Sequence, residues 1–366
     1  ELSKKEILNS KRGSVIHLID TDSGGGAEKL VFYLQKEIKF TEKVITFSKL
    51  SKENRRGSKY TSLNIKNKSP LSIIFASFFI FIKLIKMENK NNIILHSHLT
   101  KSLYATFLPS IILGIPHIHT EHNTHNKRRS KWYIYPFENM IYNSLKYIIC
   151  ISEATRFELF THIPSLKLHK VSVIENGTKL IKHKNRHFNN HRFNILILGS
   201  LTYKKGIDLF LSSIPSVVNR INKISIIGSG PEKKKLVSLS KKLKLDKVTE
   251  FIEYTSDIET YIYKADLGVT PSRWEGFGLV ALEMRSSGLP ILISDTPGIY
   301  NIFANYNGVF SFANGSKESL KKSLIKLLDM LSENKLNIKN LTNDFKKYNI
   351  ESFINNYKIF YNTADL

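Results

Sequence analysis

The strongest constraint on the fold is an alternation of strand and helix patterns that runs along the chain and restarts halfway. Short runs rich in isoleucine, valine and leucine lead through glycine-containing loops into helical patterns, which is typical of parallel sheets with helical connections. The sequence therefore predicts an α/β protein with doubly wound sheets. Strands are expected at 15–19, 44–47, 93–96, 117–120, 147–151, 171–174, 194–198, 223–227, 249–252, 267–270 and 291–294, and helices at 27–36, 71–82, 102–113, 208–218 and along the tail at 316–361.

A polar, basic and aperiodic stretch at residues 181–192 divides the two runs of alternation and is expected to be a linker. The 366 residues also exceed what one hydrophobic core usually serves. We expect an N-terminal Rossmann-like domain over 1–180, a C-terminal one over 193–345, and a final helix at 346–366 that packs back on the first. Ligands are expected at the carboxyl ends of the strands.

Composition narrows the class of protein. The single cysteine, Cys150, excludes an intrachain disulfide framework and fits a reducing cytoplasm. The apolar run at residues 71–82 would span roughly 18 Å as a helix, against about 30 Å for the hydrocarbon core of a bilayer. A buried helix is therefore the first interpretation of this run, and an interfacial helix is the alternative.

The net charge of +24 is spread over both halves, with +14 in residues 1–180 and +10 in the remainder. No zinc-knuckle spacing, RNP1 pattern or basic region with heptads accompanies it, so nucleic acid is not an expected partner. Attraction to an anionic membrane surface is the better interpretation.

The segment Pro271–Glu283, with the sequence PSRWEGFGLVALE, is the most specific motif of the chain. It follows the expected strand Leu267–Thr270 and leads into a helix that we expect to begin near Leu279. A helix start presents backbone N–H groups and a partial positive charge, which favour a diphosphate. Gly276 and Gly278 let the backbone approach a ligand without an intervening Cβ.

Two acids of this segment, Glu275 and Glu283, are eight residues apart. One carboxylate can bind a sugar hydroxyl while the other binds a ribose diol. The alternative is that Glu283 is a surface acid of the helix and that the glycines only form a turn. The shared strand, loop and helix setting favours a ligand site.

With these residues the sequence resembles glycosyltransferase family 4, whose members have an E-x(7)-E motif and the GT-B fold, two Rossmann-like domains facing each other across a cleft. The resemblance implies that Glu283 binds the nucleotide ribose, that Glu275 binds a donor-sugar hydroxyl, and that the Gly276–Leu279 amides, Phe277 included, hold the distal phosphate or the sugar. It implies a retaining transfer from a nucleotide-sugar, expected to be a UDP-sugar.

Other landmarks of the family occur in order along nearly the whole chain. Gly25 and Gly26 belong to the first glycine loop, which in relatives lies against acceptor and donor phosphate. His122 ends the "T-x-H" element, whose histidine contacts the donor, and it is a candidate catalytic residue with Glu275 and Lys205. The matching segments are Gly24–Glu28, His96–His98, Thr120–His122, Ile151–Glu153, Glu175–Gly177 and Gly228–Pro231.

One landmark departs from the family. Relatives carry an arginine and a lysine that both grip the diphosphate, and this chain keeps the lysine as Lys205 but has Ser200 where the arginine is expected. A bidentate guanidinium contact is therefore missing. Lys204 and Arg273 are the candidates to replace it.

Metal ions and cofactors are not expected. Asp20 and Asp22 form a D-x-D pattern that could hold a divalent metal, but it follows the first strand and precedes glycines, as in a GT-B loop where cationic groups and helix dipoles neutralise phosphate. His96 and His98 lack a carboxylate or cysteine at ligand spacing, so zinc is not expected either.

A basic and aromatic stretch, residues 127–147, is a candidate acceptor or membrane face. A helix that packs its aromatic residues into the first domain is the equal alternative. The expected acceptor is a saccharide or lipid-linked saccharide of bacterial capsule, O-antigen or lipopolysaccharide synthesis, reached from the cytoplasmic side of the membrane. The residues proposed for this face are Lys127, Arg128, Arg129, Lys131 and Trp132.

Two other functions stay open at this point. The departure at Ser200 is compatible with a non-catalytic module that binds nucleotide-sugars on a GT-B scaffold. A GT-B epimerase or phosphorylase is the second alternative, since these enzymes share the fold.

Overall fold

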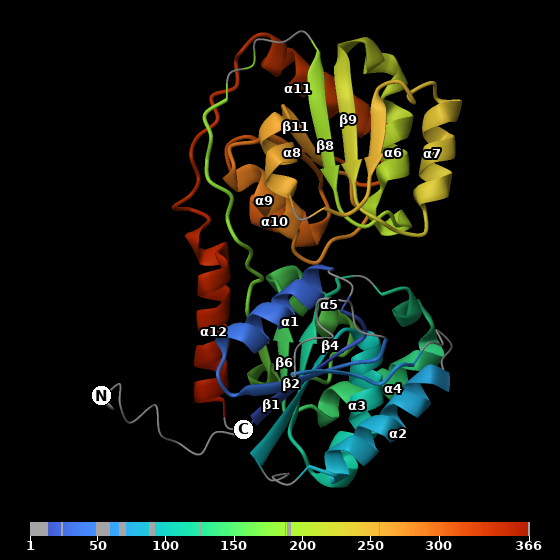
Figure 1. Cartoon of the computed structure of the whole chain (residues 1–366), viewed down its shortest axis with the longest axis vertical. Helices are drawn as coiled ribbons and strands as arrows, with labels where there is room; N and C mark the ends of the chain where they lie inside the picture. Colours follow the sequence, from blue (N-terminus) through green and yellow to red (C-terminus); the bar gives the residue numbers. More distant parts are fainter. Residues whose placement is uncertain are drawn as a thin grey trace. The chain divides into compact units, whose positions relative to one another are not determined.

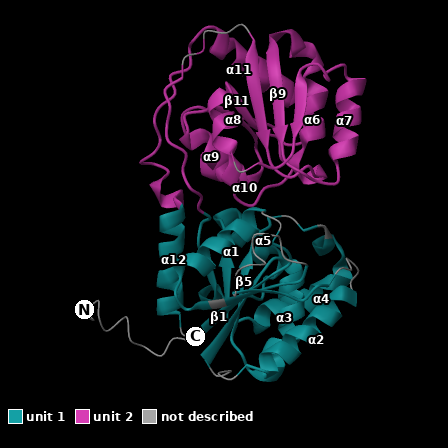
Figure 2. Ribbon diagram, in the orientation of Figure 1, with its two compact units in different colours: residues 1–176, 350–366 teal, residues 177–349 magenta. Residues whose placement is uncertain are grey.

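The computed structural model describes residues 14–22, 25–48, 59–65, 71–87, 92–124, 126–186, 188, 192–255 and 257–364. The chain forms two compact units (Figure 1 and Figure 2), with residues 1–176 and 350–366 in unit 1 and residues 177–349 in unit 2. Gly24 of the expected glycine loop, and residues 187 and 189–191 of the expected linker, lie outside the described residues.

Unit 1 is built on a seven-stranded sheet in the order β3-β2-β1-β4-β5-β6-β7. All neighbouring strands are parallel. Most of their apolar side chains are fully buried, as expected of strands covered on both faces. The strands are β1 (Ser14–Ile19), β2 (Thr41–Thr46), β3 (Tyr60–Ser62), β4 (Ile93–His98), β5 (His117–Glu121), β6 (Tyr147–Cys150) and β7 (Val171–Val173).

The helices of unit 1 cover this sheet, and α12, from the far end of the sequence, packs beside α1 (Figure 1). The predicted end of α3 at Gly114 is confirmed, because this glycine adopts the left-handed conformation (φ 64°) that commonly terminates helices. The α-helices are α1 (Gly26–Glu37), α2 (Leu71–Ile85), α3 (Thr100–Leu113), α4 (Tyr135–Ser144), α5 (Glu153–His162) and α12 (Ile350–Thr363); 3-10 turns include η4 (Lys127–Ser130) and η5 (Trp132–Ile134).

Unit 2 contains a six-stranded sheet in the order β10-β9-β8-β11-β12-β13. Its neighbouring strands are also parallel, which confirms the predicted fold class. The strands are β8 (Phe193–Leu198), β9 (Ile221–Ile227), β10 (Thr249–Ile252), β11 (Leu267–Thr270), β12 (Ile291–Ser294) and β13 (Val309–Phe312), and the α-helices are α6 (Ile207–Ser213), α7 (Lys233–Lys242), α8 (Ile258–Lys264), α9 (Leu279–Ser286), α10 (Pro297–Phe303) and α11 (Lys317–Ser332).

Two predicted helices are shorter than expected. The helix expected over 208–218 ends at Ser213, because Pro215 lacks the N–H that an α-helix needs and a 3-10 turn follows. The tail expected to be helical over 316–361 is helical only in part: α11 ends at Ser332, and Asn334 has a left-handed backbone (φ 50°). The polar segment that follows contains one 3-10 turn before α12 begins.

Within the described ranges, no helix combines the length and the apolar character needed to cross a bilayer.

Candidate functional site

Glu275 lies in the loop between β11 and α9 and is held by an ion pair. Its carboxylate accepts hydrogen bonds from Lys205 Nζ (2.7 Å) and from the Ser272 hydroxyl (3.1 Å). Burial alone would raise the pKa of Glu275, but Lys205 and Lys204 outweigh burial and lower this pKa to about 2. Glu275 is therefore an ionised hydrogen-bond acceptor at any physiological pH.

Lys205 reaches Glu275 because two loops of unit 2 are joined along their backbones. Lys205 ends the 3-10 turn Tyr203–Lys205 after β8, and the N–H of Arg273 donates to the carbonyl of Lys204 (2.8 Å). Gly206 allows this approach: its φ is +63°, and a Cβ there would lie 1.9 Å from the Pro271 carbonyl oxygen. Only glycine combines this conformation with this contact.

Glu283 lies in α9, and its carboxylate accepts a hydrogen bond from the Thr178 hydroxyl (2.8 Å). The helix begins after Gly278, whose backbone is left-handed (φ 92°), and no side chain among the described residues caps its first turn. Its start is thus formed by backbone groups, as an anion site at a helix N-terminus requires. Phe277 is buried against the ring of Tyr348 and anchors the loop.

Arg273 and Lys204, the candidates to replace the missing arginine, have different surroundings. Arg273 makes two hydrogen bonds to the Asp208 carboxylate (2.6 and 2.8 Å), and its guanidinium lies 3.8 Å from the ring centroid of Tyr203. Burial lowers the pKa of Lys204, and the nearby charge of Glu275 opposes this effect. Ser200 is exposed at the end of β8. The charge of Lys204 interacts with that of Glu275, whereas Arg273 already has the carboxylate of Asp208 as its partner.

In unit 1, Gly25 and Gly26 form the start of α1. Asp20, from the D-x-D pattern, accepts hydrogen bonds from the backbone N–H (3.0 Å) and the hydroxyl (2.8 Å) of Ser102. Burial raises the pKa of Asp20, and these hydrogen bonds oppose the effect. This acid therefore anchors the start of α3.

His122 follows β5 and belongs to a hydrogen-bonded row of three histidines. His17 Nδ1 lies 2.9 Å from His98 Nε2, and His98 Nδ1 lies 3.3 Å from His122 Nε2. Burial lowers the pKa of His17 to about 3 and that of His98 well below its ordinary value, so both rings are neutral. The tautomer of His98 therefore decides whether His122 Nε2 donates or accepts.

The proximity of His17, His96 and His98 was missed from the sequence. A ligand nitrogen of each lies within 4.8 Å of the others, which raises the question of a metal centre. The rings of His96 and His98 are stacked (centroids 4.3 Å apart, planes at 27°), so their in-plane lone pairs do not converge on one point. His96 also contacts the Tyr361 hydroxyl through Nδ1 and the Thr120 hydroxyl through Nε2. In the structure the cluster is packed as an imidazole stack with hydroxyl partners.

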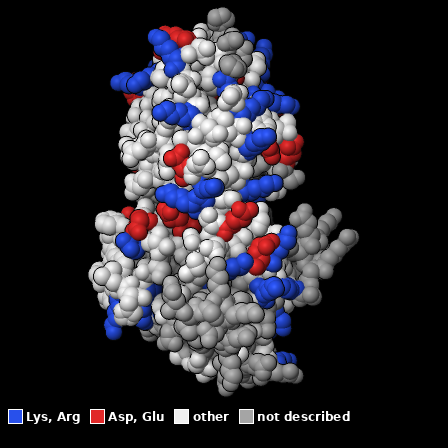
Figure 3. All heavy atoms as spheres, turned by 90° about the vertical axis from the view of Figure 1, so that its left-hand side faces the viewer, with Lys and Arg blue, Asp and Glu red and all other residues white. Residues whose placement is uncertain are grey.

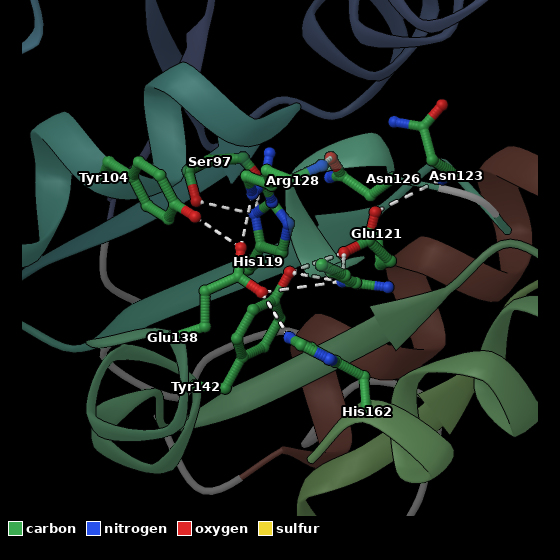
Figure 4. A network of polar contacts seen from close by, with 11 residues as sticks. Ser97, Tyr104, His119, Glu121, Asn123, Asn126, Arg128, Glu138, Tyr142 and His162 are labelled. Carbon is green, nitrogen blue, oxygen red and sulfur yellow. Dashed lines mark hydrogen bonds and ion pairs between the residues drawn. The ribbon is translucent and has the colours of Figure 1, made fainter. Parts of the chain in front are cut away.

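Arg128, proposed for the acceptor or membrane face, lies instead in a largely buried network of polar contacts (Figure 4), and the ion pairs of Arg129 belong to the same network. Arg129 donates to Glu121 (2.8 Å), and Arg128 pairs with Glu138, a fully buried acid. Glu138 also accepts from His162 (2.6 Å) and from a tyrosine hydroxyl. Burial would raise the pKa of Glu121, but Arg129 lowers it to about 2.

The expectation for Arg128 and Arg129 is therefore corrected. Their side chains are 19% and 10% exposed, because each neutralises a buried carboxylate that would otherwise be strongly destabilising. Lys131 and Trp132 are exposed, and Trp132 is 84% accessible. The side chain of Lys127 lies outside the described residues. On the face seen in Figure 3, basic side chains occur in separate clusters beside acidic ones rather than in one continuous area.

Comparison with known proteins assigns the family. The model for Glycosyltransferase Family 4 matches residues 24–180, and the model for Glycosyl transferases group 1 matches residues 179–350. Fold and sequence thus define the class, a protein of GT-B architecture. The chain belongs to the group 1 glycosyltransferases of family 4.

Curated relatives match over part of their length. An uncharacterized glycosyltransferase of Methanocaldococcus jannaschii is 35% identical over 122 residues, 32% of this chain and 31% of that protein. The O-antigen biosynthesis glycosyltransferase WclY of Escherichia coli is 32% identical over 141 residues, 38% of this chain and 37% of that protein. The matched segments thus span about a third of each of these relatives.

Solved structures match over nearly the whole chain. HepE of Anabaena, in complex with UDP and glucose, has a TM-score of 0.80 at 14% identity and covers 96% of this chain and 100% of its own. The lipopolysaccharide outer core galactosyltransferase WaaB has a TM-score of 0.70 at 14% identity, with the same coverage. At this identity the likeness concerns the fold.

Proposed function

We propose that the protein transfers a sugar from a UDP-sugar to a saccharide or lipid-linked saccharide, with retention of the anomeric configuration. The observation that carries the proposal is the pairing of Lys205 with Glu275 in the loop before α9, with Glu283 eight residues further along. This arrangement offers one cation, two acceptors and a helix start within a single unit. A sugar diphosphate needs these groups for its phosphates and its two sets of hydroxyls.

Each group has a role that its surroundings support. Glu283 binds the ribose diol, since its carboxylate already accepts a hydrogen bond from the hydroxyl of Thr178. Glu275, with its lowered pKa, accepts a hydrogen bond from a donor-sugar hydroxyl. The ammonium of Lys205 has three donors, so it can keep Glu275 and still bind a phosphate oxygen. The diphosphate lies against the backbone at Gly276–Leu279.

The chemistry follows from where charge develops. The bond between the anomeric carbon and the diphosphate breaks through an oxocarbenium-like state, and negative charge grows on the leaving group. Lys205 and the start of α9 stabilise this charge more in the transition state than in the ground state. The acceptor oxygen forms its bond on the same face, and its proton passes to the departing phosphate. His122, Gly25 and Gly26 keep the donor-side roles that the family resemblance implies.

The donor and the biological setting are supported by relatives. HepE is described in complexes with UDP-glucose and with UDP and glucose, which supports UDP as the nucleotide here. WclY acts in O-antigen biosynthesis and WaaB in the lipopolysaccharide outer core, which supports a surface polysaccharide as the product.

Attachment to the cytoplasmic face of an anionic membrane is part of the proposal. Apolar side chains of α2 are turned to solvent, with Ile74, Phe75 and Phe78 each 58–67% exposed. Exposed apolar surfaces of this kind mark sites of interaction. Lys131 and Trp132 supply the basic and aromatic groups that suit a membrane interface.

The proposal is tested by incubating the protein with a panel of sugar nucleotides and measuring release of UDP, with and without lipid-linked acceptors. Glu275→Gln and Glu283→Gln are each expected to lower turnover by about 100-fold or more. The matched control is Glu250→Gln, which removes an acid of the same unit from a half-exposed ion pair with Lys223. Binding of UDP-sugars without any turnover would favour the non-catalytic module, and a changed sugar on UDP without transfer would favour an epimerase.

A further inference from the structure

Unit 1 contains an apolar groove bounded by α2, α3 and the η5–α4 segment, with a volume of about 750 Å³. None of the described residues that line it is charged, and apart from Ser77 and two tyrosines they are all apolar. The volume lies within the range of pockets that hold small ligands. Among the residues that line it are Ile74, Ser77, Phe78, Leu108, Ile112 and Met140.

The groove is not a by-product of the core. The inner face of α2 is completed by Ser72, Ala76, Ile80 and Leu84, which recur every four residues and are buried. The residues of α2 that line the groove lie outside this buried row, and two of them stay open to solvent, with Ile74 67% and Phe78 58% exposed. Leu108, Ile112 and Met140 add exposed apolar groups from α3 and α4. This second apolar face therefore has the character of an interaction site for an apolar partner.

Two tyrosines of the groove lining each have a basic side chain over the ring, and the charge of one of these, Arg128, is already neutralised by Glu138. The Arg128 guanidinium lies 5.0 Å from the ring centroid of Tyr104, and Lys131 Nζ lies 5.9 Å from the ring centroid of Tyr133. Both tyrosines line the groove. The Tyr104 hydroxyl also donates to Glu138, so this part of the wall is rigidly held. An occupant that matches both features has an apolar chain and an anionic head.

We propose that the groove binds the hydrocarbon chain of a phosphorylated single-chain lipid, with its phosphate beside Lys131. The inference deepens the proposed function, on which it rests, by assigning the lipid part of the acceptor to a defined pocket. A flat bilayer surface would meet the exposed rim of α2 but would not fill a concave groove. A second copy of the chain is a less suitable occupant, because it would have to place an acidic side chain opposite the adjacent positive charge.

The test measures binding of geranylgeranyl monophosphate, below its micelle concentration, by titration calorimetry in the absence of any sugar nucleotide. The unmodified protein is expected to bind this lipid at least tenfold more tightly than inorganic phosphate. Ser77→Phe fills the groove and is expected to weaken lipid binding at least tenfold. Ile112→Trp narrows the groove from its exposed side and serves as the second variant if Ser77→Phe melts at a lower temperature. Lys131→Glu is expected to weaken binding of the same lipid through its head group.

The matched control is Phe79→Ala, which changes an exposed apolar residue of α2 outside the groove lining. It is expected to keep lipid binding and to weaken binding to vesicles of phosphatidylcholine and phosphatidylglycerol. Ser77→Phe is expected to show the reverse pattern. Equal lipid binding by folded Ser77→Phe and Ile112→Trp would overturn the inference. So would lipid binding no tighter than phosphate, or a dimer in sedimentation that Ile112→Trp dissociates. None of these readouts depends on donor turnover, so failure of the proposed function is seen separately.

Discussion

The carboxyl edges of the two sheets are built from different chemical groups. In unit 1 buried side chains lead up to this edge, with six histidines on or directly after β1, β4 and β5, all at most 9% exposed. In unit 2 the edge is shaped by backbone, and glycines such as Gly206 and Gly298 allow one backbone segment to contact another closely. Titratable rings make unit 1 sensitive to pH, whereas close backbone contacts make unit 2 sensitive to single methyl groups.

The largest expected effect is the loss of unit 1 in mild acid. His17, His117 and His119 have pKa values of about 3, 3 and 4 in the folded protein because burial opposes their charge. Below about pH 6.5 the unfolded chain binds protons that these folded rings do not, so stability is full above this pH and falls as the pH decreases. At about pH 5 each ring lowers the free energy of unfolding by about 2 kcal/mol. Three such decreases together approach the whole stability of a domain.

Hydrogen exchange with peptide mass spectrometry is the measurement for this prediction. Peptides of the unit 1 sheet are expected to lose protection between about pH 6.5 and 5, while those of the unit 2 sheet keep it. His117→Gln should reduce the slope of stability against pH by one proton. Equal protection of both sheets at about pH 5 would contradict the comparison.

A single methyl group should disturb unit 2. A Cβ on Gly298 would lie 1.8 Å from the carbonyl oxygen of Glu275, so Gly298→Ala has to displace the loop that carries this acid. We expect at least a tenfold rise in KM for the UDP-sugar, measured by steady-state kinetics. Gly315→Ala is the control: it has a left-handed backbone (φ +74°) but open space around it, and costs about 1 kcal/mol in stability without a kinetic effect. Equal kinetics for both variants would show that the loop tolerates the displacement.

The histidine row of unit 1 offers a smaller test. His98→Ala removes the group at hydrogen-bonding distance from His122, and turnover is expected to fall on the order of tenfold, as for other residues that orient a functional group. His98→Asn retains a polar group near the Nδ1 position and should restore part of the rate. The pH dependence of kcat should change in His98→Ala but not in His98→Asn. A lower melting temperature with unchanged kinetics would assign His98 a structural role only.

The smallest expected effect concerns binding of the UDP diphosphate at the position of Ser200. Ser200→Arg restores a guanidinium at the exposed end of β8, and we expect a few-fold decrease in the Kd for UDP, because a charge-assisted hydrogen bond in partial contact with water contributes about 1 kcal/mol. Ser200→Lys should achieve less, since an ammonium cannot form the bidentate contact. Titration calorimetry with UDP measures both variants. An unchanged Kd for Ser200→Arg would indicate that this position does not face the diphosphate.

Periodicity was sufficient to predict the fold class, because apolar runs and glycine loops are local signals. It failed where local signals compete, as in the tail, where the apolar pattern of α11 gives way to polar residues before α12 resumes. The linear spacing of Glu275 and Glu283 was readable, but the contact of Glu275 with a lysine 70 residues earlier required the fold.

The buried charges of unit 1 show a second limit of sequence reasoning. Arg128 and Arg129 have the sequence context of a basic surface patch, yet their partners Glu121 and Glu138 lie within ten residues and are buried. Sequence records the presence of charges but not which of them are removed from water. For the histidines, a weak signal existed in the repeated His-x-His at the end of β4 and the start of β5, since residues two apart share one face of a strand.

The return of α12 to unit 1 has a consequence for how the chain is made. Tyr361 contacts His96, and Tyr357 lies 3.1 Å from the Thr120 hydroxyl, so the buried polar edge of the first sheet is completed by side chains of the last helix. During synthesis these tyrosines emerge from the ribosome only after all of unit 2. The unit that begins first is therefore finished last, and unit 2 can complete its core while the histidine stack of unit 1 still lacks its closing partners.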